Sequence, residues 1–495
     1  MSDKVTFEFL KNHLWKAADI LRGSLDAGEY RQPVMTLLFL KRLNDTFEEN
    51  AEKLLKAGKS QKEAYENPAR HNFFIPKQAR WKILSETTEK VGETIDHVCK
   101  LIERENPDLD GVMTNTKYSD RRKYPDDKLR QLISHFNYPS LKNSDLEKED
   151  IFGDAYEYLL AEFADETKKK GGEFFTPREI VRLLVSLVEP KEGMKICDPT
   201  CGSGGMLIES RKYVERSGGN PRNLILEGQE SNYGNLAMCK MNMVLHDIID
   251  FKIEYGDVLS NPKLVEGGRL KTYDRVLANF PFSMNWDSKI AAKDSYNRFR
   301  FGVPPAKDKA DFAFIQHMFS CLNGKGQAAI ICSQGVLFRG GEEVKIREGM
   351  IKEDVIEGIV ALPSNLFYGT GIPACVLILD RNKPANRKNK IIFIHGAKDY
   401  QEGKTRNTLR DSDIKKIVSA FKNYKDIDGY CHIANLEELQ ENEFNLNVPR
   451  YVDISEHEEE IDIQKTIDEL KKLEKEKQEL EVRVISNLKE LGFKV

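Results

Sequence analysis

Residues 198–205 read Asp-Pro-Thr-Cys-Gly-Ser-Gly-Gly, and they lie between a short apolar run at 195–197 and a helical pattern. Glycines let the backbone come close to a ligand, and the N-terminus of a helix presents free N–H groups. The stretch predicts a strand–turn–helix unit that binds a nucleotide-like ligand, although an ordinary tight turn would look the same. It matches neither a dinucleotide fingerprint nor a P-loop, because its glycines stand at 202, 204 and 205 and no Lys-Ser or Lys-Thr follows them.

Short apolar runs alternate with helical patterns on both sides of this turn. Strands that alternate with helices favour right-handed crossovers and a largely parallel sheet, so the predicted fold class is α/β. The last two runs are separated only by a Gly-rich loop, and they can form an antiparallel pair at the edge of the sheet. The expected strands are 195–197, 224–226, 251–255, 275–278, 328–332, 356–362 and 374–379.

The N-terminal part of the chain lacks this alternation. Residues 1–164 predict an all-helical domain, in which the pattern at 34–47 indicates one helix with Pro33 at its start. A second strong helical pattern covers residues 151–167. Residues 165–435 are then expected to form the α/β domain.

The C-terminal stretch 436–495 predicts a helical tail for subunit docking. Apolar residues recur every seven positions, a second line runs beside them, and Glu and Lys fill much of the remainder. A narrow two-line seam is typical of a coiled-coil-like helix that packs on a partner helix, whereas the alternative is an amphipathic helix folded back on its own domain. The first line is Ile463, Leu470, Lys477, Val484 and Leu491, and the second is Leu473 and Leu480.

The composition excludes several classes of protein. With 76 Lys plus Arg and 80 Asp plus Glu, the 495-residue chain has a formal net charge of -4, which excludes a histone-like protein but not a local basic cleft. The apolar runs are too short to cross a bilayer, and the N-terminus lacks the apolar segment of a secretion signal, so no membrane association is expected. Eight cysteines without paired spacings indicate reduced thiols in a cytoplasmic protein, and no zinc-ligand spacing predicts a metal.

Acidic residues follow the next two expected strands. Glu230 follows the strand at 224–226, where a carboxylate can accept hydrogen bonds from both hydroxyls of a ribose. Its position after a strand favours this role over that of a solvent-facing carboxylate. Asp257 ends the third strand, where a carboxylate can bond the amino group of an adenine, although Gly-Asp is also common in turns.

The fourth expected strand leads into Asn279-Phe280-Pro281-Phe282. An Asn amide oxygen and a backbone carbonyl can accept hydrogen bonds from an exocyclic amine, Pro281 stiffens the turn, and Phe282 can stack on a flat base. An enzyme that acts on a base in a duplex must flip it out and hold it by such contacts. The alternative is a strand-ending turn with two core phenylalanines.

A Thr-Pro element stands upstream, where residues 172–178 read Gly-Glu-Phe-Phe-Thr-Pro-Arg. Thr176 can cap the following helix, with Glu179 three residues on completing a capping box, which is the alternative to a ligand role. A threonine hydroxyl and a helix N-terminus also suit a carboxylate ligand, so the capping role and a ligand role can hold together.

Taken in this order, the Thr-Pro element, the Asp-Pro-x-x-Gly-Ser-Gly loop and the Asn-x-Pro-Phe turn resemble the N6-adenine class of amino-group DNA methyltransferases. Further stretches resemble the modification (M) subunit of type I restriction-modification systems, and the resemblance covers essentially the whole chain. They are 38–42 (Leu-Phe-Leu-Lys-Arg), 152–159 (Phe-Gly-Asp-Ala-Tyr-Glu-Tyr-Leu), 172–178 and 445–451 (Asn-Leu-Asn-Val-Pro-Arg-Tyr). One departure is Phe280, because the family's usual tetrapeptide is Asn-Pro-Pro followed by Phe or Tyr. The backbone carbonyl at this position is kept, but one fixed φ angle is lost.

The resemblance implies a central Rossmann-like, S-adenosylmethionine-dependent methyltransferase domain without a metal. Asn279 and the Phe280 carbonyl would bind the target N6 amine, and Phe282 would stack on the flipped adenine. Asp257 would contact the adenine of either the cofactor or the target. The implied catalytic residues are Asn279, Phe280, Pro281 and Phe282. The implied cofactor-binding residues are Glu173, Phe174, Phe175, Thr176, Pro177, Arg178, Asp198, Gly202, Ser203, Gly204, Gly205, Glu230 and Asp257.

The resemblance also implies partners: DNA, a separate specificity (S) subunit and a second M subunit, and it leaves open whether a restriction (R) subunit joins. The central domain has no insertion long enough to form a base-reading domain, so the S subunit is expected to read the DNA sequence, and the tail is expected to dock on it. Two other functions stay open. One is methyl transfer to RNA or to protein amides, and the other is a non-catalytic scaffold, which only Phe280 favours.

Overall fold

The glycine-rich turn follows β1 in a nine-stranded sheet of order β11-β10-β8-β9-β7-β6-β1-β2-β3. Strands β9 and β11 run antiparallel to the other seven, so the predicted α/β fold with a largely parallel sheet is confirmed. The strands are β1 (Lys195–Asp198), β2 (Ile225–Glu230), β3 (Lys252–Tyr255), β6 (Tyr273–Asn279), β7 (Leu322–Ser333), β8 (Ile356–Ala361), β9 (Ala374–Asp380), β10 (Lys390–His395) and β11 (Cys431–Asn435). A separate two-stranded ribbon consists of β4 (Val265–Glu266) and β5 (Arg269–Leu270).

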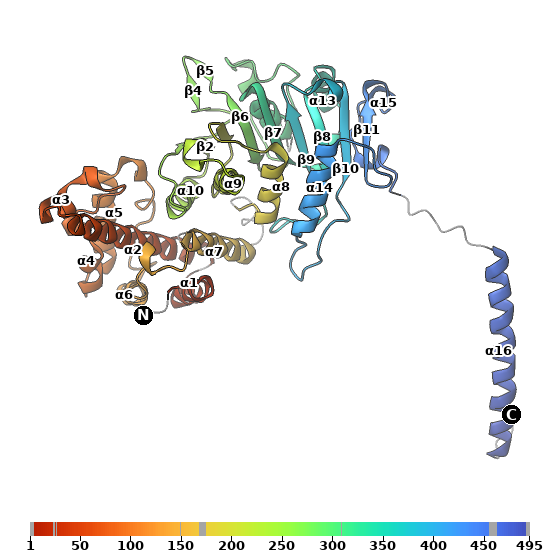
Figure 1. The fold of residues 1–495 in the computed structure, drawn as a ribbon, viewed down its shortest axis with the longest axis horizontal. Helices are drawn as coiled ribbons and strands as arrows, with labels where there is room; N and C mark the ends of the chain where they lie inside the picture. Colours follow the sequence, from red (N-terminus) through yellow and green to blue (C-terminus); the bar gives the residue numbers. More distant parts are fainter. Residues whose placement is uncertain are drawn as a thin grey trace. The chain divides into compact units, whose positions relative to one another are not determined.

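The computed structural model describes residues 4–22, 25, 27–148, 150–167, 175–307, 309–454 and 463–491, and Figure 1 labels most of its elements. The N-terminal helices are α1 (Phe7–Leu21), α2 (Ala27–Lys56), α3 (Gln61–Glu66), α4 (Trp81–Glu86), α5 (Val91–Glu105), α6 (Asp126–Phe136) and α7 (Ile151–Thr167). The later helices are α8 (Arg178–Val188), α9 (Gly205–Arg216), α10 (Tyr233–Leu245), α11 (Lys289–Ala292), α12 (Asp311–Ser320), α13 (Glu342–Lys352), α14 (Asp411–Asn423), α15 (Leu436–Glu441) and α16 (Ile463–Glu490).

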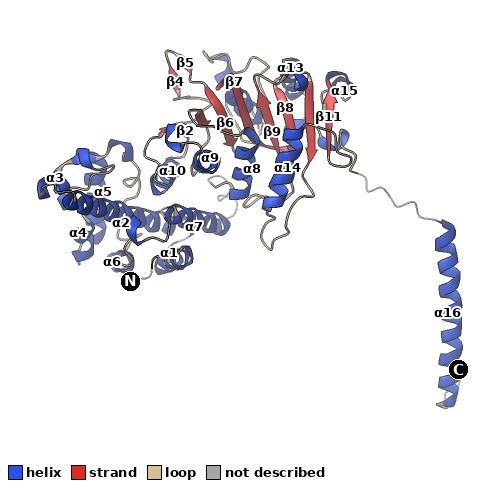
Figure 2. Ribbon diagram, in the orientation of Figure 1, coloured by secondary structure: helices blue, strands red, loops and turns tan. Residues whose placement is uncertain are grey.

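Helices cover both faces of the sheet, which is why its strands read as short apolar runs in the sequence. Along β7, Ala329 and Ile331 belong to a buried cluster with residues of α8, α9, α10 and α14. Ala328 and Ile330 belong to a second buried cluster, with residues of α12 and α13. Successive side chains of a strand point to opposite faces, so one run supplies both cores. Figure 2 shows helices on the two sides of the strands.

The antiparallel pairing of β8 with β9 is confirmed, but its predicted place at the edge of the sheet is wrong. β9 lies between β7 and β8, and the missed strands β10 and β11 lie beyond β8. Residues 391–394 of β10 are buried in the clusters on the two faces of the sheet, and β10 pairs with β8 on one side and β11 on the other. These two additional neighbours move β8 and β9 into the interior of the sheet.

The predicted all-helical N-terminal domain is confirmed, but the predicted start of its long helix is wrong. Helix α2 begins at Ala27 and contains Pro33 in its interior. A proline there removes one backbone hydrogen bond. Tyr30, Val34 and Leu37 are fully buried around it, and we attribute the continuation of the helix to this burial.

The N-terminal helices pack directly on the α/β part of the chain. Their buried cluster includes Ala237, Met238 and Met241, which all lie on α10. By contact density the chain divides into two compact units, Met1–Val452 and Asp453–Val495. The domain boundaries after residues 164 and 435 stay predictions.

The second unit contains α16. Its seam residues Leu470, Leu473, Leu480 and Val484 are all more than half exposed. The helix spans the predicted heptad pattern as far as Val484 and ends at Glu490, one residue before Leu491, and the coiled coil itself stays a prediction.

Candidate active site

The turn between β1 and α9 has the backbone conformation that its glycines allow. Gly202 and Gly204 have φ values of 51° and 81°. A Cβ atom on Gly204 would stand 2.9 Å from the Sγ of Cys239, so α10 leaves no room for a side chain there. Asn242, also on α10, donates from Nδ2 to the Ser203 carbonyl at 2.8 Å. The glycine-rich turn is therefore held from behind by α10, a support that the sequence prediction missed.

Two buried carboxylates stand at the front of this turn. Glu230 accepts hydrogen bonds from the Gly202 and Asn232 backbone N–H groups at 2.9 and 2.7 Å. Asp198 accepts one from the Thr200 N–H at 3.0 Å. Burial raises the pKa of Asp198 to about 8, and the nearby Glu230 carboxylate raises it too. Burial likewise raises the pKa of Glu230, although its backbone donors oppose this. Both carboxyls thus gain from a ligand that donates hydrogen bonds or carries positive charge.

Two cavities meet at the carboxyl ends of the strands, where parallel sheets bind ligands. One of about 430 Å³ is lined by Glu230 and Asp257 and by the turn that follows β6. A smaller one is lined by the glycine-rich turn and the Thr-Pro element. Thr200 and Asn279 line both cavities. The predicted site residues that line one or both are Phe175, Thr176, Asp198, Gly202, Ser203, Gly205, Glu230, Asp257, Asn279, Pro281 and Phe282.

Other predicted site residues have a different place. Arg178 pairs with Glu157 and Asp154 of α7, and neither it nor Pro177 is among the cavity-lining residues. Glu173 and Phe174 lie outside the residues that the structure describes. The Asp257 carboxylate accepts hydrogen bonds from the Leu259 N–H at 3.0 Å and from the Ser260 hydroxyl at 2.6 Å, as a Gly-Asp turn residue does. Asp257 also lines the larger cavity.

Thr176 does not cap the following helix, which was the alternative to its ligand role. Helix α8 begins at Arg178 with Pro177 as its N-cap, and no side chain caps it. The Thr176 hydroxyl instead accepts a hydrogen bond from Asn279 Nδ2 at 3.0 Å. Glu179, expected to complete the capping box, pairs with Arg406. The local capping preference is overridden because the fold brings the Asn279 amide to the same hydroxyl.

The aromatic rings of the Asn-x-Pro-Phe turn have unequal exposure. Phe280 is 2% exposed and stacks on Phe314 of α12, with 5.0 Å between ring centroids. Phe282 lines the larger cavity and contacts Phe280 and Phe367 edge to face. Phe280 therefore anchors the turn in the core, and Phe282 is the ring that a ligand can reach. The sequence analysis did not predict that Phe314 and Phe367 contact this turn. The only sequence signal near either residue is the Gly-rich loop that follows Phe367.

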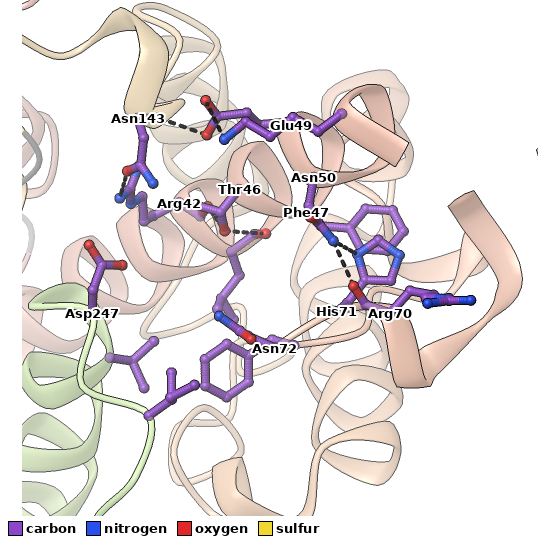
Figure 3. Close-up of a pocket in the computed structure, with 15 residues that line it drawn as sticks. Arg42, Thr46, Phe47, Glu49, Asn50, Arg70, His71, Asn72, Asn143 and Asp247 are labelled. Carbon is purple, nitrogen blue, oxygen red and sulfur yellow. Dashed lines mark hydrogen bonds and ion pairs between the residues drawn. The ribbon is translucent and has the colours of Figure 1, made fainter. Parts of the chain in front are cut away.

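A further, polar pocket of about 250 Å³ lies away from this site, between the N-terminal helices and the residues at and after the end of α10 (Figure 3). Asn50 donates from Nδ2 to the Arg70 carbonyl at 2.8 Å, and the Thr46 hydroxyl donates to the Arg42 carbonyl at 2.9 Å. Asp247 comes from the other side of the pocket. Several of its polar groups thus bond to one another.

Two other features, a metal-binding cluster and a membrane-spanning helix, are absent from the described part of the chain. In the ranges that the structure covers, no group of three or more His, Cys, Asp or Glu residues could hold a metal ion. No helix among those ranges is both long enough and apolar enough to cross a membrane.

The sheet order, the glycine-rich turn after β1 and the Asn-x-Pro-Phe turn after β6 define a Rossmann-like methyltransferase. Residues 147–460 match the family described as N-6 DNA methylase, and residues 10–136 match the HsdM N-terminal domain. The chain belongs to the N-6 DNA methylase family, as a methylase subunit of the type I restriction enzyme kind.

Three similar proteins support this assignment. The methylase subunit of the type I restriction enzyme MjaVII from Methanocaldococcus jannaschii is 33% identical over 97% of this chain and 84% of its own length. That of HindI from Haemophilus influenzae is 32% identical over 85% of this chain and 100% of its own. The solved type I restriction-modification methyltransferase subunit from Streptococcus thermophilus has a TM-score of 0.80 at 28% identity, with 91% of this chain and 100% of that chain covered. The predicted resemblance and its class of activity, N6-adenine methylation of DNA, are confirmed.

Proposed function

We propose that this chain transfers the methyl group of S-adenosylmethionine to the N6 amine of an adenine flipped out of double-stranded DNA. The proposal rests on one observation: the cavity beside the glycine-rich turn and the cavity beside the Asn279–Phe282 turn share Thr200 and Asn279. A cofactor that spans both cavities, with its methionine portion at the glycine-rich turn and its ribose at Glu230, would therefore lie next to a base at the Asn279–Phe282 turn. Such positioning accounts for most of the rate that this reaction needs.

The residues that line the two cavities fit S-adenosylmethionine, which supplies an activated methyl group when it is bound. The ammonium group and the ribose hydroxyls of the cofactor are hydrogen-bond donors, and such donors would stabilise the buried Asp198 and Glu230 carboxyls. Glu230 would hold the ribose, and Asp257 would stand at an adenine edge of the cofactor or the target. The methionine portion would be held by Asp198, Gly202, Ser203, Gly204 and Gly205, with Phe175 and Thr176. Glu173 and Phe174 stay in the proposed set, and Pro177 and Arg178 would act by starting α8.

Asn279 and the Phe280 carbonyl would hold the target amine. Because Asn279 Nδ2 donates to Thr176, the amide is oriented and its oxygen is left for a substrate donor. Two acceptors on the two amine hydrogens would direct the nitrogen lone pair toward the methyl group. Phe282 would stack on the base, and Pro281 would stiffen the turn. The Phe280 departure is compatible with this role, because its ring anchors the turn on Phe314.

The expected partners are DNA, a specificity (S) subunit and a second M subunit, with an R subunit as a further candidate. A net charge of -4 supports a separate DNA reader, since sequence-independent affinity comes from phosphates neutralised by Lys and Arg. The exposed seam of α16 supports a helical docking partner, because exposed apolar lines are typical of interaction surfaces. We propose that this seam docks on helices of the S subunit.

The test is transfer of a labelled methyl group from S-adenosylmethionine to DNA by the chain assembled with its S subunit. Label in the adenine N6 position, seen after nuclease digestion, supports the proposal. Cofactor binding without transfer to DNA would point to the scaffold alternative, and transfer to RNA or protein alone would point to the other rival.

A further inference from the structure

The residue that follows the Asn279–Phe282 turn has an unfavourable backbone conformation. Ser283 has a φ of 52°, in the left-handed region that residues with a side chain rarely adopt. A conformation of this kind persists only where the surroundings enforce it. The Ser283 N–H donates to Asp311 Oδ1 at 2.9 Å. Asp311 is the first residue of α12 and is fully buried.

A partly buried arginine completes this attachment. Arg339 donates from Nη1 to Asp311 Oδ2 at 2.6 Å, and from Nη2 to the Ser333 hydroxyl at 3.1 Å and the Ser283 hydroxyl at 3.4 Å. Glu343, also fully buried, lies 3.5 Å from Arg339 Nη1. Arg339 thus stands between two buried carboxylates, with its second nitrogen directed at the end of the turn.

Helix α12 holds the turn at two points. Phe314, three residues after Asp311, stacks on Phe280, while Asp311 holds Ser283. Asp311 and Arg339 are not among the residues that line either cavity. They are therefore placed to act on the turn, and through it on Asn279 and Phe282, without touching a ligand.

We propose that Asp311 and Arg339 are positioning residues for methyl transfer: they hold Ser283 in its left-handed conformation and so fix the Asn279–Phe282 turn at the target base. This inference rests on the proposed function of that turn. Loss of Asp311 or Arg339 should therefore lower the turnover number and leave the affinity for the cofactor unchanged, because the cofactor-facing residues Asp198 and Glu230 belong to other elements.

The first experiment measures methylation by Asp311→Asn in the assembled complex. The asparagine keeps the size and one acceptor but loses the charge that orients Arg339, so kcat should fall at least tenfold while the Kd of S-adenosylmethionine stays within twofold. Adding Ser283→Gly should restore part of kcat, because glycine adopts a φ of 52° without strain. The matched control is Glu357→Gln, which breaks the buried Glu357–Arg387 pair at 2.7 Å on β8, away from the site. It should leave kcat unchanged.

The second experiment does not depend on activity. Hydrogen exchange of the peptide over residues 279–284 should quicken in Asp311→Ala and not in Glu357→Gln, while residues 273–278 of β6 stay protected. Unchanged kcat in a folded Asp311→Asn, an equal loss in the control, or unchanged exchange in Asp311→Ala would overturn the inference. If the wild-type complex methylates no DNA while the exchange responds as expected, the proposed function fails and the attachment of the turn stands.

Discussion

Replacing Glu230 by alanine should weaken S-adenosylmethionine binding about tenfold to a hundredfold. The carboxylate is buried at the end of β2 and would be the acceptor for two ribose hydroxyls. A hydrogen bond to a charged group contributes about 1.5–3 kcal/mol, and each 1.4 kcal/mol is a factor of ten in Kd. In the unsubstituted chain the Gly202 and Asn232 N–H groups donate to this carboxylate at 2.9 and 2.7 Å, and the substitution leaves both without an acceptor. The glycine-rich turn should therefore loosen as well, which adds to the loss.

Isothermal titration calorimetry with S-adenosylmethionine measures this directly. The matched control is Glu227→Gln, a buried carboxylate three residues earlier on β2 that pairs with Lys271 and Tyr273 and is not among the cavity-lining residues. It should cost folding stability without changing the Kd. A folded Glu230→Ala with an unchanged Kd would remove Glu230 from the site. An equal loss in Glu227→Gln would show that the effect comes from the strand and not from a ligand contact.

Four further outcomes are expected. Thr176→Val removes the acceptor of Asn279 Nδ2, and the loss of a hydrogen bond of about 0.5–1.5 kcal/mol should slow methylation about twofold to tenfold. Thr176→Ser keeps the hydroxyl and should methylate at the wild-type rate, so equal rates in the two variants would contradict the prediction. Asn279→Ala should abolish methyl transfer and spare cofactor binding, and full methylation by this variant would refute the mechanism. Phe282→Ala should weaken extrusion of the target base by about 1–3 kcal/mol, which a fluorescent base analogue at the target would report. Deleting the chain after Asp453 should leave cofactor binding intact and prevent co-elution with the S subunit in size-exclusion chromatography, and a truncated chain that still forms the complex would sink the docking role. Burial raises the Asp198 pKa from 3.8 to about 8, so the contribution of Asp198 to folding stability is present below pH 3.8 and lost as the pH rises to about 8. In urea unfolding, Asp198→Asn should reduce this loss of stability between pH 3.8 and 8. An unchanged pH profile of stability in the variant would contradict the prediction.

The sequence by itself determined the α/β fold and the helical N-terminal part, and it located the candidate site along the chain. The turn at 198–205, Glu230 at the end of β2 and the Asn279–Phe282 turn at the end of β6 were all recognisable, because their signals are local. Glycines mark a turn that needs positive φ, and a polar residue after an apolar run marks the end of a buried strand. The carboxyl ends of parallel strands meet at one edge of a sheet, so residues identified separately come together without any knowledge of the packing angles.

Only the tertiary structure decided which side chains meet. Thr176 has the sequence context of a helix cap, yet it accepts from Asn279, which lies 103 residues away in the sequence. Asp311 and Ser283 meet across the start of α12, and two strands beyond β8 move the predicted edge pair into the interior of the sheet. Capping and proline preferences amount to about 1–3 kcal/mol, which is similar to the free energy of one buried contact. Local preferences of this size are decided by partners that the folded chain brings from distant positions, and a local pattern carries no information about them.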